Sequence, residues 1–410
     1  MENNSLSFIH CADLHLDSPF KGLGHVPNSA FEQIRDSTFA SLRALTELAI
    51  EKQVDFVLIV GDVFDDNKQS LKARMQFRKA LENLEKHDIA VFLSYGNHDS
   101  TSGNDFVDQF PKNVHVFTDQ KVSCIPFIKN GKTAAHIYGF SYRERAVHEN
   151  KTEEFTAAGD APFHIGMLHG SIHTNSDHDV YAPFKISDLT GKNFDYWALG
   201  HIHARELLKQ QPPIVYPGNI QGRSKKETGP KGCYYVELDK ENADLQFFPL
   251  QQIRFENIEL DVSACKDAQD LEPVIERSLS QCRQTFGRSI LHVTFTSDRP
   301  MHVEWQQAGY FEDAVDYVND SNRFGDKWTL IQGYDLYVTK SWSKEELQKG
   351  NHFAGELVRL FNDTDNIQQY LQPLLRHRQA RKFSEPFTEQ EEEQIKDEAR
   401  DLLLTQLLKK

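Results

Sequence analysis

The sequence lacks the features that mark secreted, membrane-spanning and disulfide-stabilised proteins. Its five cysteines are odd in number and show no close pairing, so they fit neither a disulfide framework nor the spacing of a cysteine zinc site. No apolar run approaches the roughly 18 residues that a membrane helix needs, and no basic segment followed by an apolar one opens the chain as a secretion signal. These absences predict a cytoplasmic protein with no membrane partner.

An excess of positive charge is also missing. The chain has 46 lysines and arginines against 61 aspartates and glutamates, a formal net charge of −15, whereas nucleic-acid-binding proteins are usually basic. Residues 1–240 hold 26 basic and 31 acidic side chains, and residues 241–410 hold 20 and 30. Fourteen of the 18 histidines precede residue 240. Because histidine serves both metal sites and acid–base catalysis, we expect the chemistry in the first part of the chain.

What is present is enough apolar material for a folded core, with 39% hydrophobic residues. The length of 410 residues predicts two or three domains. The apolar runs 6–11, 54–60 and 89–95 predict buried strands, which alternate with helical patterns over residues 29–49 and 68–86. This alternation is typical of an α/β layered domain, in which ligand sites gather beyond the carboxyl ends of the strands.

The pattern changes after residue 112 to short strands and turns. A hairpin is predicted over residues 121–140 through Asn130-Gly131, and residues 218–232 are expected to form a loop rich in glycine and lysine. Strand and helix signals alternate from about residue 253 to 340, and the chain looks helical from Phe353 onward. We therefore expect a catalytic domain over residues 1–250, a small α/β domain over 251–345 and a C-terminal helical segment over 346–410.

Seven metal-ligand side chains stand in short polar motifs, each next to the end of a predicted strand. Carboxylate, amide and imidazole donors together suit Mn²⁺, Fe, Co or Zn²⁺ rather than Ca²⁺ or a thiolate zinc site. Seven donors are too many for one ion, but two ions bridged by one carboxylate would use them all. An isolated aspartate or histidine at a strand end is usually a cap or a satisfied polar group, so the metal interpretation depends on the whole set. The seven are Asp13, His15, Asp62, Asn97, His169, His201 and His203.

In this order the motifs resemble those of the calcineurin-like metallophosphoesterase family over about residues 6–235. The resemblance implies a four-layer β-sandwich flanked by helices and two divalent metal ions per chain, of which we favour Mn²⁺. The first ion would be bound by Asp13, His15, Asp62 and His203, and the second by Asp62, Asn97, His169 and His201. His98 would protonate the leaving oxygen or stabilise the developing charge, and the carboxylate of Asp65 would orient His98.

Three segments resemble the bacterial SbcD-type DNA nucleases, in particular the subgroup called YhaO, which is described as a DNA repair exonuclease. The segments are 8–20 (FIHCADLHLDSPF), 197–203 (WALGHIH) and 216–223 (YPGNIQGR). The resemblance implies DNA as substrate, a small capping domain after the catalytic domain, and C-terminal helices that bind a coiled-coil ATPase subunit. Arg223, Lys225 and Lys226 are candidates for binding the DNA phosphates, although they also fit an ordinary surface loop.

Two other functions stay open at this point. A small-molecule or nucleotide phosphodiesterase of the same family would use residues 251–410 for dimerisation or substrate selection. A non-catalytic assembly subunit would hold structural metals, but such a site has no use for His98, which is not among the expected metal ligands.

The C-terminal helix predicted over residues 389–408 is acidic at its start and apolar at its end. The apolar end either packs on the chain's own domain or binds a partner, which includes a second copy of the chain in a homodimer. Its apolar residues are Ile395, Leu402, Leu403, Leu404, Leu407 and Leu408.

Two divalent ions also change the meaning of the acidic composition. They would add four positive charges to the net −5 of residues 1–240, whose carboxylates include Asp13 and Asp62. The acidity therefore excludes a generic basic DNA binder but not a nuclease.

Overall fold

The structure is a computed structural model that describes residues 5–20, 26, 28–66, 69–100, 110–173, 180–322, 324–339, 344–350, 352–364, 367, 370–372 and 387–408. The chain divides into two units. One contains residues 1–257, 279–292 and 322–332, and the other contains residues 258–278, 293–321 and 333–410. The domain boundaries expected at residues 250 and 345 stay a prediction.

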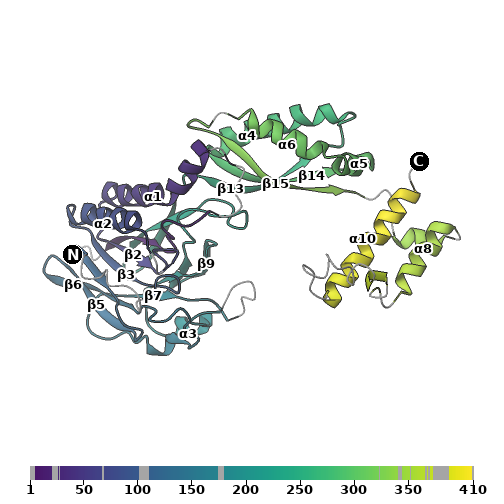
Figure 1. Cartoon of the computed structure of the whole chain (residues 1–410). Helices are drawn as coiled ribbons and strands as arrows, with labels where there is room; N and C mark the ends of the chain where they lie inside the picture. The colour runs from purple at the N-terminus through teal and green to yellow at the C-terminus, as the bar shows by residue number, and fades with distance from the viewer. Residues whose placement is uncertain are drawn as a thin grey trace. The chain divides into compact units, whose positions relative to one another are not determined.

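Two six-stranded sheets form the first unit (Figure 1). In spatial order, the first sheet is β12 (Ala243–Pro249), β11 (Gly232–Leu238), β1 (Leu6–Cys11), β2 (Phe56–Val60), β3 (Ala90–Ser94) and β4 (Val114–Val116). The second is β5 (Ser123–Lys129), β6 (Lys132–Gly139), β7 (Phe163–His169), β8 (Tyr196–Gly200), β10 (Pro213–Tyr216) and β9 (Glu206–Gln210). Strands β1 to β4 run parallel, as do β6, β7, β8 and β10.

The strands β1, β2 and β3 of the first sheet are buried on both faces, which explains why they are continuous apolar runs. Along β2, Phe56, Leu58 and Val60 belong to the core that also includes side chains of the second sheet. Val57 and Ile59 point to the opposite face, where they belong to the core that includes helix side chains. The period of two residues thus supplies two cores from one strand.

Helices α1 (Asn28–Glu51) and α2 (Leu71–Glu85) cover the outer face of the first sheet, and Figure 1 shows them side by side. Ser70 caps α2, because its side chain accepts a hydrogen bond from the backbone N–H of Ala73. Both helices occur where the sequence predicts them, with ends shifted by one to three residues. On the second sheet, Trp197 packs in a third core with side chains of the segments around η3 (Lys151–Glu154) and α3 (Ile186–Thr190).

The predicted hairpin is confirmed as β5 and β6, joined by Asn130 and Gly131. These two residues have φ values of 54° and 75°, which is the left-handed geometry that a two-residue hairpin turn needs. The glycine- and lysine-rich segment is also confirmed as a loop, because residues 217–231, all of which the structure describes, form no strand or helix. Two multi-strand sheets flanked by helices confirm the α/β fold class.

Beyond β12 the chain again alternates strands and helices, as predicted. A smaller sheet has the order β13, β14, β15. The elements here are β13 (Arg254–Asp261), η4 (Ala268–Asp270), α4 (Leu271–Phe286), β14 (Ser289–Ser297), α5 (Met301–Gln307), α6 (Tyr310–Asp320) and β15 (Thr329–Val338).

The C-terminal segment contains α7 (Lys344–Lys349), α8 (Phe353–Asn362) and α10 (Glu389–Leu407). The capping box expected at Thr388 is confirmed, because Thr388 and Glu391 exchange hydrogen bonds.

The apolar end of α10 divides into two faces. Leu404 is buried in a small cluster with Ala354 and Val358 of α8, so part of the end packs on its own chain. Leu402 and Leu407 are 48% and 45% exposed and do not belong to this cluster.

All five cysteines are free thiols. Within the residues that the structure describes, no helix is both long enough and apolar enough to cross a membrane.

Candidate metal centre

The predicted motifs converge at the carboxyl ends of β1, β2, β3, β7 and β8. Three groups of three residues have donor atoms that all lie within 4.8 Å of one another: Asp13 with His15 and His203, Asp13 with Asp62 and His169, and His15 with Asp65 and His98. All of these residues except His203, Asp65 and His98 are buried. Parallel strands deliver their carboxyl ends to one edge, which is why residues nearly 200 positions apart meet there.

The backbone around this edge is strained. Asp13, His15, Asp62 and His201 have backbone φ values of 53°, 41°, 50° and 95°, a region that residues other than glycine rarely adopt. Each such residue costs about 1–3 kcal/mol, and such residues cluster at functional sites. The hydrogen bond from the backbone N–H of His15 to the carbonyl of Asp62, at 3.0 Å, helps to hold the two motif loops together.

Glycines let the loops approach the histidines closely. A Cβ atom on Gly96 would lie 2.2 Å from Asp62 Oδ1 and 2.7 Å from His169 Nε2. A Cβ atom on Gly61, which has a φ of 77°, would lie 2.1 Å from His169 Nδ1. The glycines of the Gly61-Asp62 and Gly96-Asn97 motifs are therefore required by the space that the ligand side chains fill.

One half of the centre is organised around His169. Its Nδ1 donates to the carbonyl of Val60 at 3.0 Å, which leaves Nε2 facing Asn97 Oδ1 at 3.1 Å and Asp62 Oδ2 at 3.5 Å. His201 approaches the same amide, with Nδ1 3.2 Å from Asn97 Oδ1. The backbone N–H of His201 donates to both oxygens of Asp13 at 3.1 Å. Asn97, His169, His201 and Asp62 thus form one cluster.

The other half brings two imidazoles together in a T-shaped arrangement, with an angle of 69° between the ring planes. The Nε2 atoms of His15 and His203 lie 3.1 Å apart, and His15 Nε2 lies 3.8 Å from Asp62 Oδ2. Asp62 therefore stands between the two halves. All seven predicted ligand residues are brought together, and Asp62 has the position of the carboxylate expected to bridge two ions.

The donor set fits divalent cations. Two buried carboxylates, Asp13 and Asp62, make ion pairs only with histidines in the part of the chain that the structure describes. Buried carboxylates need a positive partner, and among the described residues no lysine or arginine forms an ion pair with either of them. The imidazoles of His15 and His169 turn Nε2 inward. The Nδ1 atom of His169 is held by the carbonyl of Val60, as in metal-binding histidines generally, and that of His15 lies 3.1 Å from Asp65 Oδ1.

The electrostatics agree with this interpretation. Burial lowers the pKa of His15 to about 3, so its ring is neutral and has a lone pair to donate. Burial acts to lower the pKa of His169 as well, but the charge of Asp62 and a hydrogen bond to it raise that pKa to about 9. A proton therefore sits between His169 and Asp62 where a metal ion would bind, so metal and proton compete.

His98 lies beside this cluster with its ring 4.9 Å from that of His15, between centroids. Its Nδ1 lies 2.9 Å from the main-chain carbonyl of Asp65, and its backbone N–H donates to Asp62 Oδ1. The orientation expected from the Asp65 carboxylate is thus provided by the Asp65 carbonyl. The carboxylate itself contacts His15 Nδ1 at 3.1 Å and Arg223.

Two carboxylates that lie at the centre were not assigned a role from the sequence. Asp99 is fully buried, and it accepts hydrogen bonds from the backbone N–H groups of Val63 (2.6 Å), Phe64 (3.3 Å) and Gly96 (2.8 Å). Burial and the charge of Asp62 raise its pKa to about 7. It joins the Asp62 and Asn97 loops. Its position directly after His98, as the fourth residue of the Gly96 motif, was a signal that it belonged to the site.

The other missed carboxylate is Glu227, whose Oε1 lies 2.7 Å from His203 Nδ1. Burial acts to raise the pKa of Glu227, but the hydrogen bond with His203 and the charge of Arg223 hold it well below its usual range. No local pattern in the loop from 218 to 232 distinguishes this glutamate from a surface residue.

A family model described as calcineurin-like phosphoesterase matches residues 6–205. The protein named "Uncharacterized metallophosphoesterase YhaO" from Bacillus subtilis (strain 168) is 35% identical over 405 residues, which cover 98% of each chain. The chain belongs to the calcineurin-like metallophosphoesterases. This confirms the family that the motifs indicate and the likeness to YhaO.

The metallophosphoesterase is more distantly similar to two proteins named DNA double-strand break repair protein Mre11. The one from Sulfolobus acidocaldarius is 23% identical over 315 residues, covering 73% of this chain and 77% of that protein. The one from Aeropyrum pernix is 24% identical over 322 residues, covering 72% and 74%.

The three predicted phosphate-binding residues have different surroundings in this metallophosphoesterase. Arg223 is only 16% exposed, and its guanidinium contacts the carboxylates of Asp65 and Glu227. Lys225 and Lys226 lie on the loop between β10 and β11, and both are exposed. The structure therefore brings Arg223 into the metal centre and leaves the two lysines on the surface.

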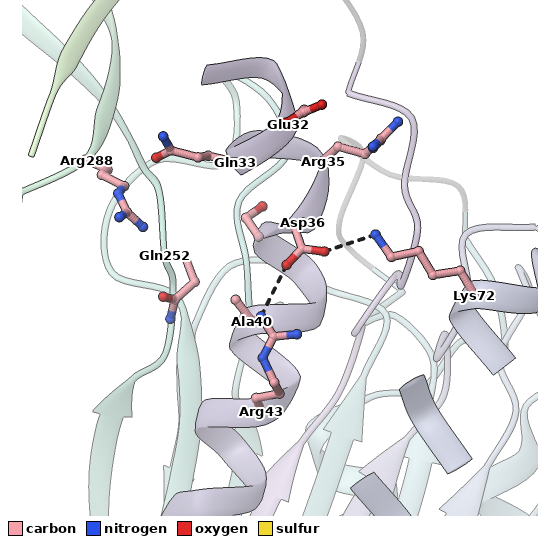
Figure 2. A pocket seen from close by; sticks show the side chains of 10 residues that line it. Glu32, Gln33, Arg35, Asp36, Ala40, Arg43, Lys72, Gln252 and Arg288 are labelled. Atoms are coloured by element: carbon pink, nitrogen blue, oxygen red, sulfur yellow. Dashed lines mark hydrogen bonds and ion pairs between the residues drawn. The ribbon is translucent and has the colours of Figure 1, made fainter. Parts of the chain in front are cut away.

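A polar pocket of about 730 Å³ lies against α1, and none of the predicted site residues lines it. In Figure 2, dashed lines join Asp36 to Lys72 and Arg43, at distances of 3.0 Å and 3.2 Å. Arg35 and Arg288 also line it. Because the charged groups at its centre already pair with one another and are half exposed, the pocket is a solvated surface feature.

Proposed function

We propose that this metallophosphoesterase is a two-metal phosphodiesterase that hydrolyses DNA phosphodiester bonds, as an exonuclease in DNA repair. The observation that carries the proposal is the single cluster of seven donor residues with His98 beside it. A structural metal site has no use for that histidine. The similarity to proteins named for DNA double-strand break repair supports DNA as the substrate.

The residues would divide between two ions around the Asp62 carboxylate. Asp13, His15, Asp62 and His203 would bind the first, and Asp62, Asn97, His169 and His201 the second. Mixed carboxylate, amide and imidazole donors support Mn²⁺ as the ion. Two such ions would supply an acidified water and neutralise charge on the phosphate oxygens.

His98 is the proposed general acid. A carbonyl oxygen only accepts hydrogen bonds, so the contact with the Asp65 carbonyl requires the His98 proton on Nδ1. Nε2 is then the atom that gains a second proton and donates it to the oxygen that leaves phosphorus. Asp65 thus fixes which nitrogen carries out the proton transfer.

A panel of substrates tests the proposed function. The purified chain with Mn²⁺ would be given linear duplex DNA, single-stranded DNA, cyclic nucleotides and a chromogenic phosphodiester. Hydrolysis of DNA is expected. Hydrolysis of the small esters alone would replace the nuclease with a small-molecule phosphodiesterase, and no hydrolysis with any divalent metal would leave a non-catalytic assembly subunit.

Lys225 and Lys226 are the proposed phosphate contacts on the surface. Their replacement together by glutamine should weaken DNA binding and reduce the slope of log affinity against log salt by about one for each phosphate that is no longer neutralised. Binding measured at a series of salt concentrations checks this, with the exposed Lys86→Gln as the control. An unchanged slope would remove both lysines from the interface.

The exposed leucines of α10 support an assembly role for the C-terminal segment. We propose that they bind a coiled-coil ATPase subunit, with a homodimer as the other occupant. Sedimentation of the chain with and without residues 387–410 tests the homodimer, because only self-association would make its oligomeric state depend on this segment.

A further inference from the structure

Two carboxylates stand behind the imidazoles of His15 and His203, on the side away from their Nε2 atoms. Glu227 Oε1 lies 2.7 Å from His203 Nδ1, and Asp65 Oδ1 lies 3.1 Å from His15 Nδ1. An ionised carboxylate only accepts hydrogen bonds. The hydrogen-bonding contact with the Glu227 carboxylate therefore requires a proton on His203 Nδ1, which leaves Nε2 as the atom that can carry the lone pair. At His15 the charge of Asp65, 3.1 Å from Nδ1, favours the same Nδ1–H form, and the two Nε2 atoms are 3.1 Å apart.

One arginine joins the two carboxylates. The Arg223 guanidinium contacts Asp65 Oδ1 through Nη1 and Glu227 Oε1 through Nη2, the latter at 3.2 Å. Arg223 Nη2 also lies 3.3 Å from His203 Nδ1. That contact does not make Nδ1 an acceptor, because Glu227 Oε1 is nearer and requires a donor there. The planar fork of arginine suits this bridging role, which a lysine could not fill.

Glu227 is itself held in one position. Its Oε2 accepts hydrogen bonds from Asn219 Nδ2 at 2.9 Å and from the backbone N–H of Arg223 at 2.7 Å. Asn219 is fully buried, and the Glu227 side chain is 13% exposed. A carboxylate with donors on both oxygens does not rotate away from the histidine it faces.

We propose that Glu227 and Asp65, bridged by Arg223, are positioning residues that fix His203 and His15 in the Nδ1–H tautomer and aim both Nε2 atoms at one divalent cation. This inference rests on the proposed function, because it states how two ligands of the first metal are held. It gives Arg223 a role inside the metal centre in place of the phosphate contact predicted from the sequence.

The tautomers can be measured without metal and without substrate. In ¹⁵N-histidine NMR spectra of the metal-free chain, His15 and His203 should each show a protonated Nδ1 and an unprotonated Nε2, with signals assigned by their loss in His15→Gln and His203→Gln. Glu227→Ala should remove the preference at His203 and keep it at His15. A protonated Nε2 at His203 in the wild-type chain would overturn the proposal.

Metal affinity gives the second readout. Loss of a carboxylate partner behind a metal-binding histidine typically costs about 10- to 100-fold in affinity. Titration with Mn²⁺ should show this loss at one site in Glu227→Ala, a smaller loss in Glu227→Gln, which keeps an acceptor oxygen, and none in the exposed control Glu241→Ala. Unchanged affinity in Glu227→Ala would refute the positioning role.

The two readouts also separate this inference from the proposed function. The wild-type chain could show the Nδ1–H tautomer at both His15 and His203, lose it at His203 in Glu227→Ala, and yet hydrolyse no DNA. In that case the nuclease proposal fails and the positioning role stands. Should the chain hydrolyse DNA while His203 carries its proton on Nε2, the positioning role fails and the nuclease stands.

Discussion

Replacing His98 with alanine should lower the rate of phosphodiester hydrolysis by about 10²- to 10⁴-fold, which is the usual contribution of a positioned general acid. The metal ions should stay bound, because the His98 ring nitrogen is held by the Asp65 carbonyl, and the backbone N–H that donates to Asp62 remains in the variant. Initial rates with DNA, together with the number of Mn²⁺ ions bound, check both parts of this expectation.

A histidine elsewhere on the molecule provides the control. His87 is exposed at the end of α2, where its Nδ1 contacts the carbonyl of Asn83. His87→Ala should leave the rate unchanged. If His98→Ala retained the full rate, His98 could not be the proton donor. If it lost its metal ions together with its activity, the histidine would be a ligand.

Replacing Asp99 with alanine should have the largest effect on stability, a loss of about 3 kcal/mol in the free energy of unfolding. The substitution leaves three buried backbone N–H groups, those of Val63, Phe64 and Gly96, without their acceptor. Each buried donor left without a partner costs about 1–3 kcal/mol, and relief of repulsion between Asp99 and Asp62 offsets part of that cost. Chemical denaturation of the metal-free chain measures the difference.

A substitution at an exposed carboxylate shows whether the loss of stability in Asp99→Ala comes from the unpaired N–H groups or only from the loss of a charge. Asp36 pairs with Lys72 and Arg43 in the solvated pocket, and its side chain is 43% exposed. Asp36→Ala should cost less than about 1 kcal/mol, as exposed ion pairs do. Equal losses in the two variants would mean that Asp99 does not hold the Asp62 and Asn97 loops together.

The sequence predicts which side chains lie together at the candidate metal centre because of how the strands end. Asp13, Asp62 and Asn97 follow apolar runs directly, and parallel strands bring such positions to one edge without any further information. The same argument explains why His169 and His201 could be assigned from the second group of strands. The strands β1, β2 and β3 could be predicted because strands that are covered on both faces are continuous apolar runs.

The roles of the loop residues could not be predicted, because they depend on how irregular backbone folds. Nothing in the spacing of Asp65 and His98 reveals that a main-chain carbonyl replaces a carboxylate as the partner of His98. Arg223 looks like a phosphate contact in a loop with two lysines, and only the structure reveals its two carboxylate partners. Glu227 meets His203 across 24 residues of chain that carry no periodic pattern.

The acidic composition has a local explanation at the site. Asp13, Asp62 and Asp99 are all buried at one edge of the first sheet, where Asp62 repels both Asp13 and Asp99 in the absence of cations. Divalent ions would relieve this repulsion, so part of the negative charge belongs to the metal centre and is not a solvated surface.

The number of Mn²⁺ ions bound per chain is the most direct test of the proposed two-metal centre. Equilibrium dialysis of the wild-type chain should find two bound ions. Asp62→Asn should weaken the binding of both ions, because Asp62 lies against both halves of the centre. Binding of a single ion, or the loss of only one ion in Asp62→Asn, would contradict a two-metal centre bridged by this carboxylate.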